Sequence, residues 1–377
     1  MAIPESPGLG VDCAFVALRQ RLQEDVASPV FRNIEATAFR QDSLRYHLVT
    51  DEGRAAMRAR MRSWPGVPLE RVWLHPIQEL SPSTTALHSK LASQATGPGP
   101  VYLWKPLLHL VLPSWVERVV VLDLDVFLFS DIAQLWRRFE RFPPPALIGL
   151  VEEQCPSYQE ARALGGSGFN GGVQLLALSR MRASRPYATA LQRYAMHDQR
   201  LPMKPGGIGW LGDQTLYSWM SVNASGYRSL FEILPCGWNR QIGTHMAGWR
   251  GFWDRHRCDR RCHLLHGNGI AAKFIMLAMR SDPSGARCAA IVDGLRLDAR
   301  FRRGTPDGRM LELVGKTCCR SSGSLRPPRP SRRGKLGPKL GRGRGGTRGS
   351  RGSSRRGGSR SAGASPTLPT GADDTPV

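Results

Sequence analysis

The sequence predicts an α/β fold in which a largely parallel sheet is covered by helices on both faces. Short runs rich in β-branched and aromatic residues alternate with helical patterns from residue 11 to about residue 280. Such alternation is typical of βαβ units, whose parallel strands are buried on both faces. The chain has 377 residues, of which 41% are hydrophobic, so it can bury a large core. This composition excludes a wholly disordered or fibrous protein.

Eight short apolar runs bounded by turn-forming residues are predicted as strands. They are Cys13–Leu18, Leu44–Thr50, Val72–Pro76, Val119–Asp123, Ala146–Glu152, Gly172–Leu178, Phe231–Leu234 and His263–His266. Five segments with apolar residues at helical spacing are predicted as helices. They are Arg54–Arg62, Trp104–Leu110, Ile132–Phe139, Tyr187–His197 and Gln214–Met220. The stretch Ser81–Pro100 is rich in Ser, Thr, Gly and Pro and is predicted as a long loop beside a site.

Charge is distributed unevenly along the chain. The formal net charge is +23, and residues 321–377 contain 13 Lys and Arg against two acidic residues. This Gly-, Arg-, Ser- and Pro-rich stretch has too few apolar side chains to offset the entropy lost on ordering. We therefore predict an unstructured segment over 1–10, an α/β domain over 11–315 and a disordered basic tail over 316–377. Only the tail has the RGG-like composition that binds RNA, and a plain solvated extension is the alternative, so nucleic acid is not an expected partner of the domain.

The amino-terminal residues give no targeting signal. The segment from Ile3 to Gly10 contains two prolines and no apolar core, so it does not predict a signal peptide. No run of about eighteen apolar residues occurs in the sequence, so no membrane-spanning helix is predicted. We expect either a cytosolic protein or one whose amino-terminal anchor is absent from this sequence.

A pair of aspartates follows a buried strand. Asp123 and Asp125 are spaced i, i+2, so in an extended chain their side chains point to the same side. Two carboxylates at the end of a buried strand are costly unless a positive group lies between them. A divalent cation meets this need, and ligands bind at strand ends in open α/β sheets. An ordinary turn containing two aspartates is the alternative.

Further polar motifs follow the aspartate pair along the chain. Asn170 precedes two glycines that permit close approach of the backbone to a ligand. Asp213 and Gln214 begin a predicted helix, where an aspartate would also serve as a helix cap. The last two motifs are Leu234-Pro-Cys-Gly-Trp-Asn and Leu264-Leu-His-Gly-Asn-Gly. Each motif alone is weak, but the four in this order indicate one binding site.

Together these motifs resemble those of the family-eight retaining glycosyltransferases, which have the GT-A fold, a Rossmann-like fold that binds nucleotide sugars. The resemblance is greatest to the branch that contains the xyloside xylosyltransferases and the xylosyl half of the LARGE-type enzymes. It runs from about Cys13 to Lys273, is densest from Trp104 to Asn268 and leaves the basic tail uncovered. It implies a GT-A fold with a mixed, mostly parallel sheet.

The resemblance implies a metal site. In that family the Asp-x-Asp pair and a later His bind Mn²⁺, which corresponds here to Asp123, Asp125 and His266. A set of oxygen ligands with one imidazole suits Mn²⁺ better than Mg²⁺ or Ca²⁺. The expected cofactor is therefore Mn²⁺ bound to the diphosphate of a UDP-sugar.

Several residues correspond to the family's donor-binding positions. Lys105 stands where the family has a basic residue near the donor, and Asn170 with Gly171 matches the motif that orients the donor sugar. Gly267 matches the glycine after the metal-binding His, where the backbone approaches the diphosphate. Lys273 follows that His by seven residues, whereas the family's phosphate-binding lysine usually follows it by six.

Two further motifs correspond to the reacting centre and to the acceptor side. Asp213 and Gln214 match a Gly-Asp-Gln motif beside the anomeric carbon and are the expected catalytic residues. Retention of configuration requires a covalent intermediate or attack from the face of departure, and no carboxylate is placed by motif as a nucleophile. We favour the second path. Trp238 and Asn239 match a Trp-Asn pair near the acceptor.

The eight cysteines leave two interpretations open. A cluster within residues 256–266 could hold zinc, but its Cys-x3-Cys spacing is unusual and the neighbouring arginines would repel a cation. The members of this cluster are His256, Cys258, Cys262, His263 and His266. Cys236 and Cys258 fall where the xylosyltransferase branch also has cysteines. The resemblance therefore implies a disulfide between them and a lumenal compartment.

The expected function is transfer of a sugar from a UDP-sugar to a hydroxyl of a glycan or glycoprotein acceptor, with retention of configuration. The resemblance favours UDP-xylose, although UDP-hexoses stay possible because one hydroxymethyl group gives only about 1–3 kcal/mol of discrimination. It also implies the Golgi or endoplasmic reticulum lumen, reached by an anchor absent from this sequence. A non-catalytic glycan-binding module with a polyanion-binding tail is the alternative.

Overall fold

The computed structural model describes residues 10–16, 24–39, 41–93, 95, 99–154, 159–196, 211–241, 258 and 261–267, and seven single positions between 304 and 318. Most of the residues predicted to be unstructured, 1–9 and 319–377, lie outside the described residues. Among the helices described, none combines the length and the apolar character needed to cross a bilayer.

A seven-stranded sheet forms the centre of the fold, in the order β3-β2-β1-β4-β7-β6-β8. Its strands are β1 (Val11–Val16), β2 (Leu44–Thr50), β3 (Val72–Pro76), β4 (Val119–Leu122), β6 (Ile148–Glu152), β7 (Phe169–Leu176) and β8 (Phe231–Ile233). Strand β7 is antiparallel to both of its neighbours, and the other pairs are parallel, so the predicted mixed, mostly parallel sheet is confirmed. A second sheet has the order β5-β10-β9. Its strands are β5 (Val126–Leu128), β9 (Arg240–Gln241) and β10 (Leu264–His266).

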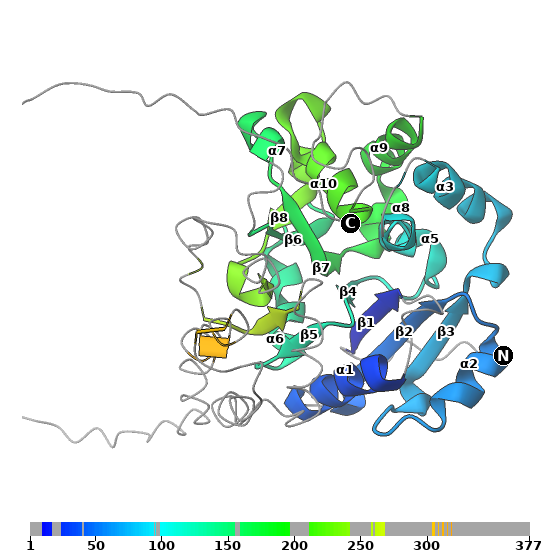
Figure 1. Cartoon of the computed structure of the whole chain (residues 1–377). Coiled ribbons are helices and arrows are strands. Elements are labelled where there is room, and N and C mark those ends of the chain that lie inside the picture. The colour runs from blue at the N-terminus through cyan, green and yellow to red at the C-terminus, as the bar shows by residue number, and fades with distance from the viewer. Residues whose placement is uncertain are drawn as a thin grey trace, which may run out of the picture. The chain divides into compact units, whose positions relative to one another are not determined.

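Helices pack on both faces of the large sheet (Figure 1). One buried cluster joins alternate residues of β1 to β3 with α1, α2, α6 and the second sheet. The other cluster joins the opposite faces of the strands with α3, α5, α8, α9 and α10. The helices are α1 (Glu24–Thr37), α2 (Arg54–Met61), α3 (Pro82–Ala92), α4 (Gly99–Tyr102), α5 (Leu108–Val111), α6 (Ile132–Trp136), α7 (Gln159–Ala163), α8 (Leu178–Ala183), α9 (Arg185–Ala195) and α10 (Asp213–Ser221).

The predicted elements agree with the structure to within a few residues. The predictions Leu44–Thr50 and Val72–Pro76 match β2 and β3 at both ends. The sequence analysis did not predict α1, which contains a proline, or the short strands β5 and β9. These two strands have three and two residues, which is too short for a periodic pattern to identify.

The prediction of one long loop over Ser81–Pro100 was wrong, because most of this stretch forms α3. Ser81 caps this helix: its hydroxyl accepts a hydrogen bond from the backbone N–H of Thr84 at 3.3 Å. Pro82 occupies the first helical position, where its missing N–H costs nothing. The Ser- and Pro-rich composition that suggested a loop is therefore a helix-start signal.

An irregularity in the pairing of β6 with β7 frees backbone groups beside the strand ends. Leu150 pairs with Gln174, but the next residue of β6, Val151, pairs with Asn170. Two residues inside this jump, Gly171 and Gly172, bond instead to groups outside β6. Bulges of this kind are common next to functional sites because they redirect the chain.

Candidate active site

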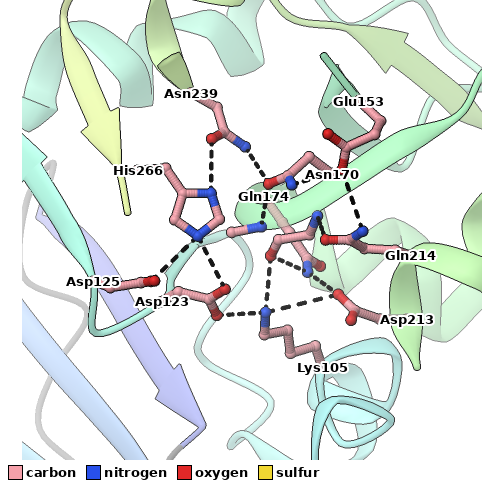
Figure 2. Close-up of polar contacts among 12 residues, drawn as sticks. Lys105, Asp123, Asp125, Glu153, Asn170, Gln174, Asp213, Gln214, Asn239 and His266 are labelled. Atoms are coloured by element: carbon pink, nitrogen blue, oxygen red, sulfur yellow. Dashed lines mark hydrogen bonds and ion pairs between the residues drawn. The ribbon is translucent and has the colours of Figure 1, made fainter. Parts of the chain in front are cut away.

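The three predicted metal ligands lie together, after the end of β4 and at the end of β10 (Figure 2). One ligand atom from each of Asp123, Asp125 and His266 can be chosen so that all three lie within 4.8 Å of one another. The Nε2 atom of His266 is 3.2 Å from Oδ1 of Asp125 and 3.6 Å from Oδ2 of Asp123. Both aspartate side chains are 20% exposed, so a ligand can reach them.

The electrostatics of this group fit a cation. Burial alone would lower the pKa of His266, but Asp125 and Asp123 outweigh it and raise the pKa to about 10. The carboxylates thus favour a positive charge at the position of the ring. Two carboxylates and one imidazole are also a donor set that divalent metals accept. The residues present therefore fit a divalent cation.

Lys105 joins the metal group to the predicted catalytic aspartate. Its ammonium group is buried and donates hydrogen bonds to Oδ1 of Asp123 at 2.6 Å and to the carbonyl of Gly171 at 2.8 Å. The same nitrogen lies 3.8 Å from Oδ2 of Asp213. Burial would lower the pKa of Lys105, but the two aspartates together raise it. Lys105 is therefore a fixed positive charge between two carboxylates.

Asp213 begins α10 and is buried against Lys105 and Gln174, whose amide donates a hydrogen bond to it. Burial raises the pKa of Asp213 to about 7, with Lys105 acting in the opposite direction and Asp123 adding to the rise. A raised folded-state pKa stabilises the fold below the unfolded-state pKa of 3.8, and this contribution is lost as pH rises through about 7.

We expect the free energy of unfolding of the metal-free protein to fall between pH 5 and pH 8, and Asp213→Asn to make this fall smaller by about 2–3 kcal/mol. The physical reason is that asparagine has no proton to lose. Urea unfolding of both proteins at the two pH values measures the difference. An equal fall in both would show that Asp213 is ionised throughout this range.

Amide side chains connect the metal group to the rest of the site (Figure 2). The Oδ1 atom of Asn239 lies 3.1 Å from Nδ1 of His266, and its Nδ2 donates to Oδ1 of Asn170 at 2.8 Å. Gln214, the other predicted catalytic residue, accepts a hydrogen bond from the backbone N–H of Gly171 at 2.9 Å. The predicted sugar-orienting and catalytic residues thus meet at one place.

Gly172 makes room for the metal-binding histidine. A Cβ atom at this position would lie 2.1 Å from Cε1 of His266, which no packed structure allows. We expect Gly172→Ala to displace the ring, to weaken Mn²⁺ binding at least about tenfold and to destabilise the fold by about 1–3 kcal/mol. Gly53→Ala is the matched control, because a Cβ there meets nothing within 4 Å. Mn²⁺ titration and urea unfolding of both variants test this, and normal binding by Gly172→Ala would contradict it.

Three other predicted substrate-binding residues, Gly267, Trp238 and Lys273, differ in where they lie. The backbone N–H of Gly267 donates to the carbonyl of Asp125 at 2.7 Å, which holds the two metal-ligand segments together. Trp238 is 4% exposed, and its ring is stacked on that of His263 with centroids 4.2 Å apart. Trp238 is therefore part of the buried core. Lys273 lies outside the described residues.

Sequence reasoning missed two polar residues of the site. Gln174 lies two residues beyond Gly172 on β7, and its amide contacts Asp213 and the carbonyl of Gly171. Glu153 follows β6 and accepts a hydrogen bond from Asn170 at 3.0 Å. Alternation along β7 could have identified Gln174, because residues i, i+2 and i+4 share one face. No comparable local signal exists for Glu153.

The cysteines form two disulfides among the described residues. Cys236 bonds to Cys258, which confirms the predicted pair, and Cys262 bonds to Cys318. Neither Cys258 nor Cys262 is a free thiolate, so the zinc interpretation of this cluster was wrong. Cys318 had been assigned to the tail, and its bond to Cys262 ties it to the segment that leads into β10. The domain boundary at residue 315 remains a prediction.

Known proteins are similar to this chain over part of its length. No protein-family profile matches the chain. Human xyloside xylosyltransferase 1 is 30% identical over 187 residues, which cover 45% of this chain and 46% of the relative. Human xylosyl- and glucuronyltransferase LARGE2 is 33% identical over 216 residues, which cover 55% of this chain and 28% of the relative. The chain therefore spans less than half the length of these curated relatives.

Solved structures share the fold over a larger part of the chain. The apo crystal structure of mouse xyloside xylosyltransferase 1 has a TM-score of 0.54 and 23% identity, and the similarity covers 70% of this chain and 98% of that one. The galactosyltransferase LgtC in complex with donor and acceptor sugar analogues has a TM-score of 0.51 and 13% identity, covering 72% and 96%. The resemblance found in the motifs is confirmed: the chain is a homologue of the xyloside xylosyltransferase and LARGE proteins, with the fold of the GT-A glycosyltransferases.

Proposed function

We propose that this protein is a metal-dependent retaining glycosyltransferase that moves a sugar, preferably xylose, from a UDP-sugar to a hydroxyl of a glycan acceptor. The observation that carries the proposal is the convergence of Asp123, Asp125 and His266 beside the buried pair of Lys105 and Asp213. A protein that only bound glycans would have no need of a costly buried charge cluster at this position.

Mn²⁺ is the metal that this donor set favours, and when bound it would neutralise charge on the departing diphosphate. The chain's own residues prepare the site for it. Lys105 holds Asp123 at 2.6 Å, which keeps that carboxylate ionised, because the ammonium and His266 overcome the effect of burial and lower the pKa of Asp123. Hydrogen bonds from backbone and amide groups hold the remaining polar atoms in place, so little reorganisation is needed during the reaction.

Retention is proposed to follow a path in which the acceptor attacks from the face that the diphosphate leaves. Asp213 is 1% exposed, lies 3.8 Å from Lys105 and accepts a hydrogen bond from Gln174. A carboxylate held in this way supports the positive charge that develops at the anomeric carbon, rather than attack on that carbon. Gln214 is placed beside it by the Gly171 backbone. Isolation of a glycosyl adduct on Asp213 would contradict this path.

The proposed compartment is the lumen of the endoplasmic reticulum or Golgi. The names of the relatives, xyloside xylosyltransferase and xylosyl- and glucuronyltransferase, support xylose as the transferred sugar and a glycan as the proposed acceptor. The two disulfides support an oxidising compartment, since such bonds persist there and are rare in the cytosol. A thiol titration of denatured, unreduced protein should find all four of these cysteines blocked.

The direct test of the proposed function is Mn²⁺-dependent release of UDP from a panel of UDP-sugars, with water as the default acceptor. Release from UDP-xylose above that from UDP-glucose and UDP-galactose is the expected result. If no UDP-sugar is hydrolysed and none raises the melting temperature in the presence of Mn²⁺, the enzymatic proposal fails and a glycan-binding module replaces it.

A further inference from the structure

We propose that Glu153 is a positioning residue that keeps the proton of the His266 ring on Nδ1, through two intervening asparagine amides, and so leaves Nε2 available to a divalent cation. The inference rests on the metal site of the proposed function. Glu153 directly follows β6 and belongs to none of the motifs found in the sequence. Its side chain is nevertheless directed into the site, where it is 4% exposed (Figure 2).

The carboxylate of Glu153 sets the direction of the first amide. An ionised carboxylate can only accept hydrogen bonds. Its Oε1 atom accepts from the backbone N–H of Gln154 at 2.9 Å, and its Oε2 atom accepts from Nδ2 of Asn170 at 3.0 Å. The amide oxygen of Asn170 must therefore point the other way. There it accepts from the backbone N–H of Gly172 at 3.0 Å and from Nδ2 of Asn239 at 2.8 Å.

The orientation of the Asn239 amide determines which ring nitrogen of His266 carries the proton. Because Nδ2 of Asn239 donates to Asn170, its Oδ1 atom is the one that faces Nδ1 of His266, at 3.1 Å. A carbonyl oxygen accepts only, so the ring nitrogen at this contact must carry a proton. The Nε2 atom, which faces Asp125 at 3.2 Å, would then hold a divalent metal through its lone pair.

Because the linked residues are buried, none of these hydrogen bonds can be replaced by a bond to water. Asn170 and Asn239 are fully buried, and His266 is 2% exposed, so bulk water cannot take the place of a missing partner. Reversing either amide would set donor against donor or acceptor against acceptor inside the protein, which is costly. Because the carboxylate of Glu153 can only accept hydrogen bonds, it fixes the orientation of both asparagine amides.

The same carboxylate also contacts the predicted catalytic amide. The Nε2 atom of Gln214 lies 3.5 Å from Oε2 of Glu153, while its oxygen accepts from the backbone N–H of Gly171. Glu153 therefore orients a residue of the reacting centre and, separately, a ligand of the metal. Glu153 is thus linked both to the catalytic group and to the metal group.

The substitution that tests the inference is Glu153→Gln, because glutamine keeps the shape but can also donate a hydrogen bond. Glu152→Gln is the matched control, since Glu152 is the adjacent residue and its side chain is exposed. Binding of Mn²⁺ alone, followed by electron paramagnetic resonance, should be about tenfold weaker in Glu153→Gln and unchanged in Glu152→Gln. Melting temperatures of the metal-free proteins show that each variant is folded.

A histidine spectrum gives a second readout that a merely structural role would not change. Protein labelled with ¹⁵N at histidine and loaded with diamagnetic Cd²⁺ should show His266 protonated at Nδ1, with the metal on Nε2. His266→Gln assigns the signal. In Glu153→Gln this signature should broaden or split into two ring forms, while Glu152→Gln keeps it.

The outcomes separate the inference from the function on which it rests. Wild-type protein that binds no Mn²⁺ would contradict the proposed metal site and remove the inference with it. Wild-type binding together with equal binding and an unchanged spectrum in Glu153→Gln would overturn the inference alone. If Glu153→Gln does not fold, the wild-type spectrum decides: a proton on Nδ1 supports the inference, and a proton on Nε2 overturns it.

Discussion

Replacing Asp125 by alanine is expected to reduce Mn²⁺-dependent release of UDP at least about 100-fold, the loss found when one electrostatic stabiliser of a transition state is removed. Asp125 supplies one of the three ligand groups, and its side chain contacts His266 at 3.2 Å. The side chain is partly exposed, and the residue it contacts, His266, is itself a member of the metal group, so its removal should affect chemistry far more than folding. UDP release at saturating Mn²⁺, compared with the wild type, measures the effect.

Asp42→Ala is the matched control for this experiment. Asp42 is an exposed aspartate in a short helical turn before β2. Asp42→Ala should leave UDP release unchanged. It should change the free energy of unfolding by no more than about 0.5 kcal/mol, which the melting temperature reports. Release by Asp125→Ala at close to the wild-type rate would show that this carboxylate does not bind a catalytic metal.

Replacing Lys105 by methionine is expected to destabilise the metal-free protein by about 3–5 kcal/mol, the usual cost of breaking a buried ion pair by removing one partner. Methionine approximates the shape of the lysine stem but removes the charge that faces Asp123 at 2.6 Å and Asp213 at 3.8 Å. Asp213 would then be buried without the cation that faces it, and Asp123 would keep only the His266 ring as a positive neighbour. Urea unfolding at pH 8 measures the loss, because a higher pH keeps the carboxylates ionised.

Two further variants separate charge from packing. Lys90→Met, on the exposed face of α3, should change the stability by no more than about 0.5 kcal/mol. The double variant Lys105→Met/Asp213→Asn should be more stable than Lys105→Met alone, because it removes the uncompensated carboxylate of Asp213. If the double variant is instead less stable by the sum of both single losses, Lys105 stabilises the fold by packing and not by pairing.

Local patterns explain what could be predicted. The strands Leu44–Thr50 and Val72–Pro76 are continuous apolar runs, and burial on both faces of a parallel sheet requires that composition. The spacing of Asp123 and Asp125 predicted that both could contact one ion, but the structure places them in the turn between β4 and β5, so this turn, and not an extended strand, brings them together. Ser81–Pro100 was misinterpreted because the same residues, Ser and Pro, favour both loops and the first turn of a helix.

The sequence by itself determined the α/β class, most strands and the identity of the residues with metal-binding and catalytic chemistry, since these depend on spacings of a few residues. Only the tertiary structure decided how these residues combine. His266 reaches Asp125 from a strand of a second sheet, and Lys105 meets Asp213 from a separate helix. Glu153 acquires its role solely from hydrogen bonds to residues distant in the chain. The direction of each such bond depends on which donor and acceptor face each other in space, and no periodicity in the sequence records that.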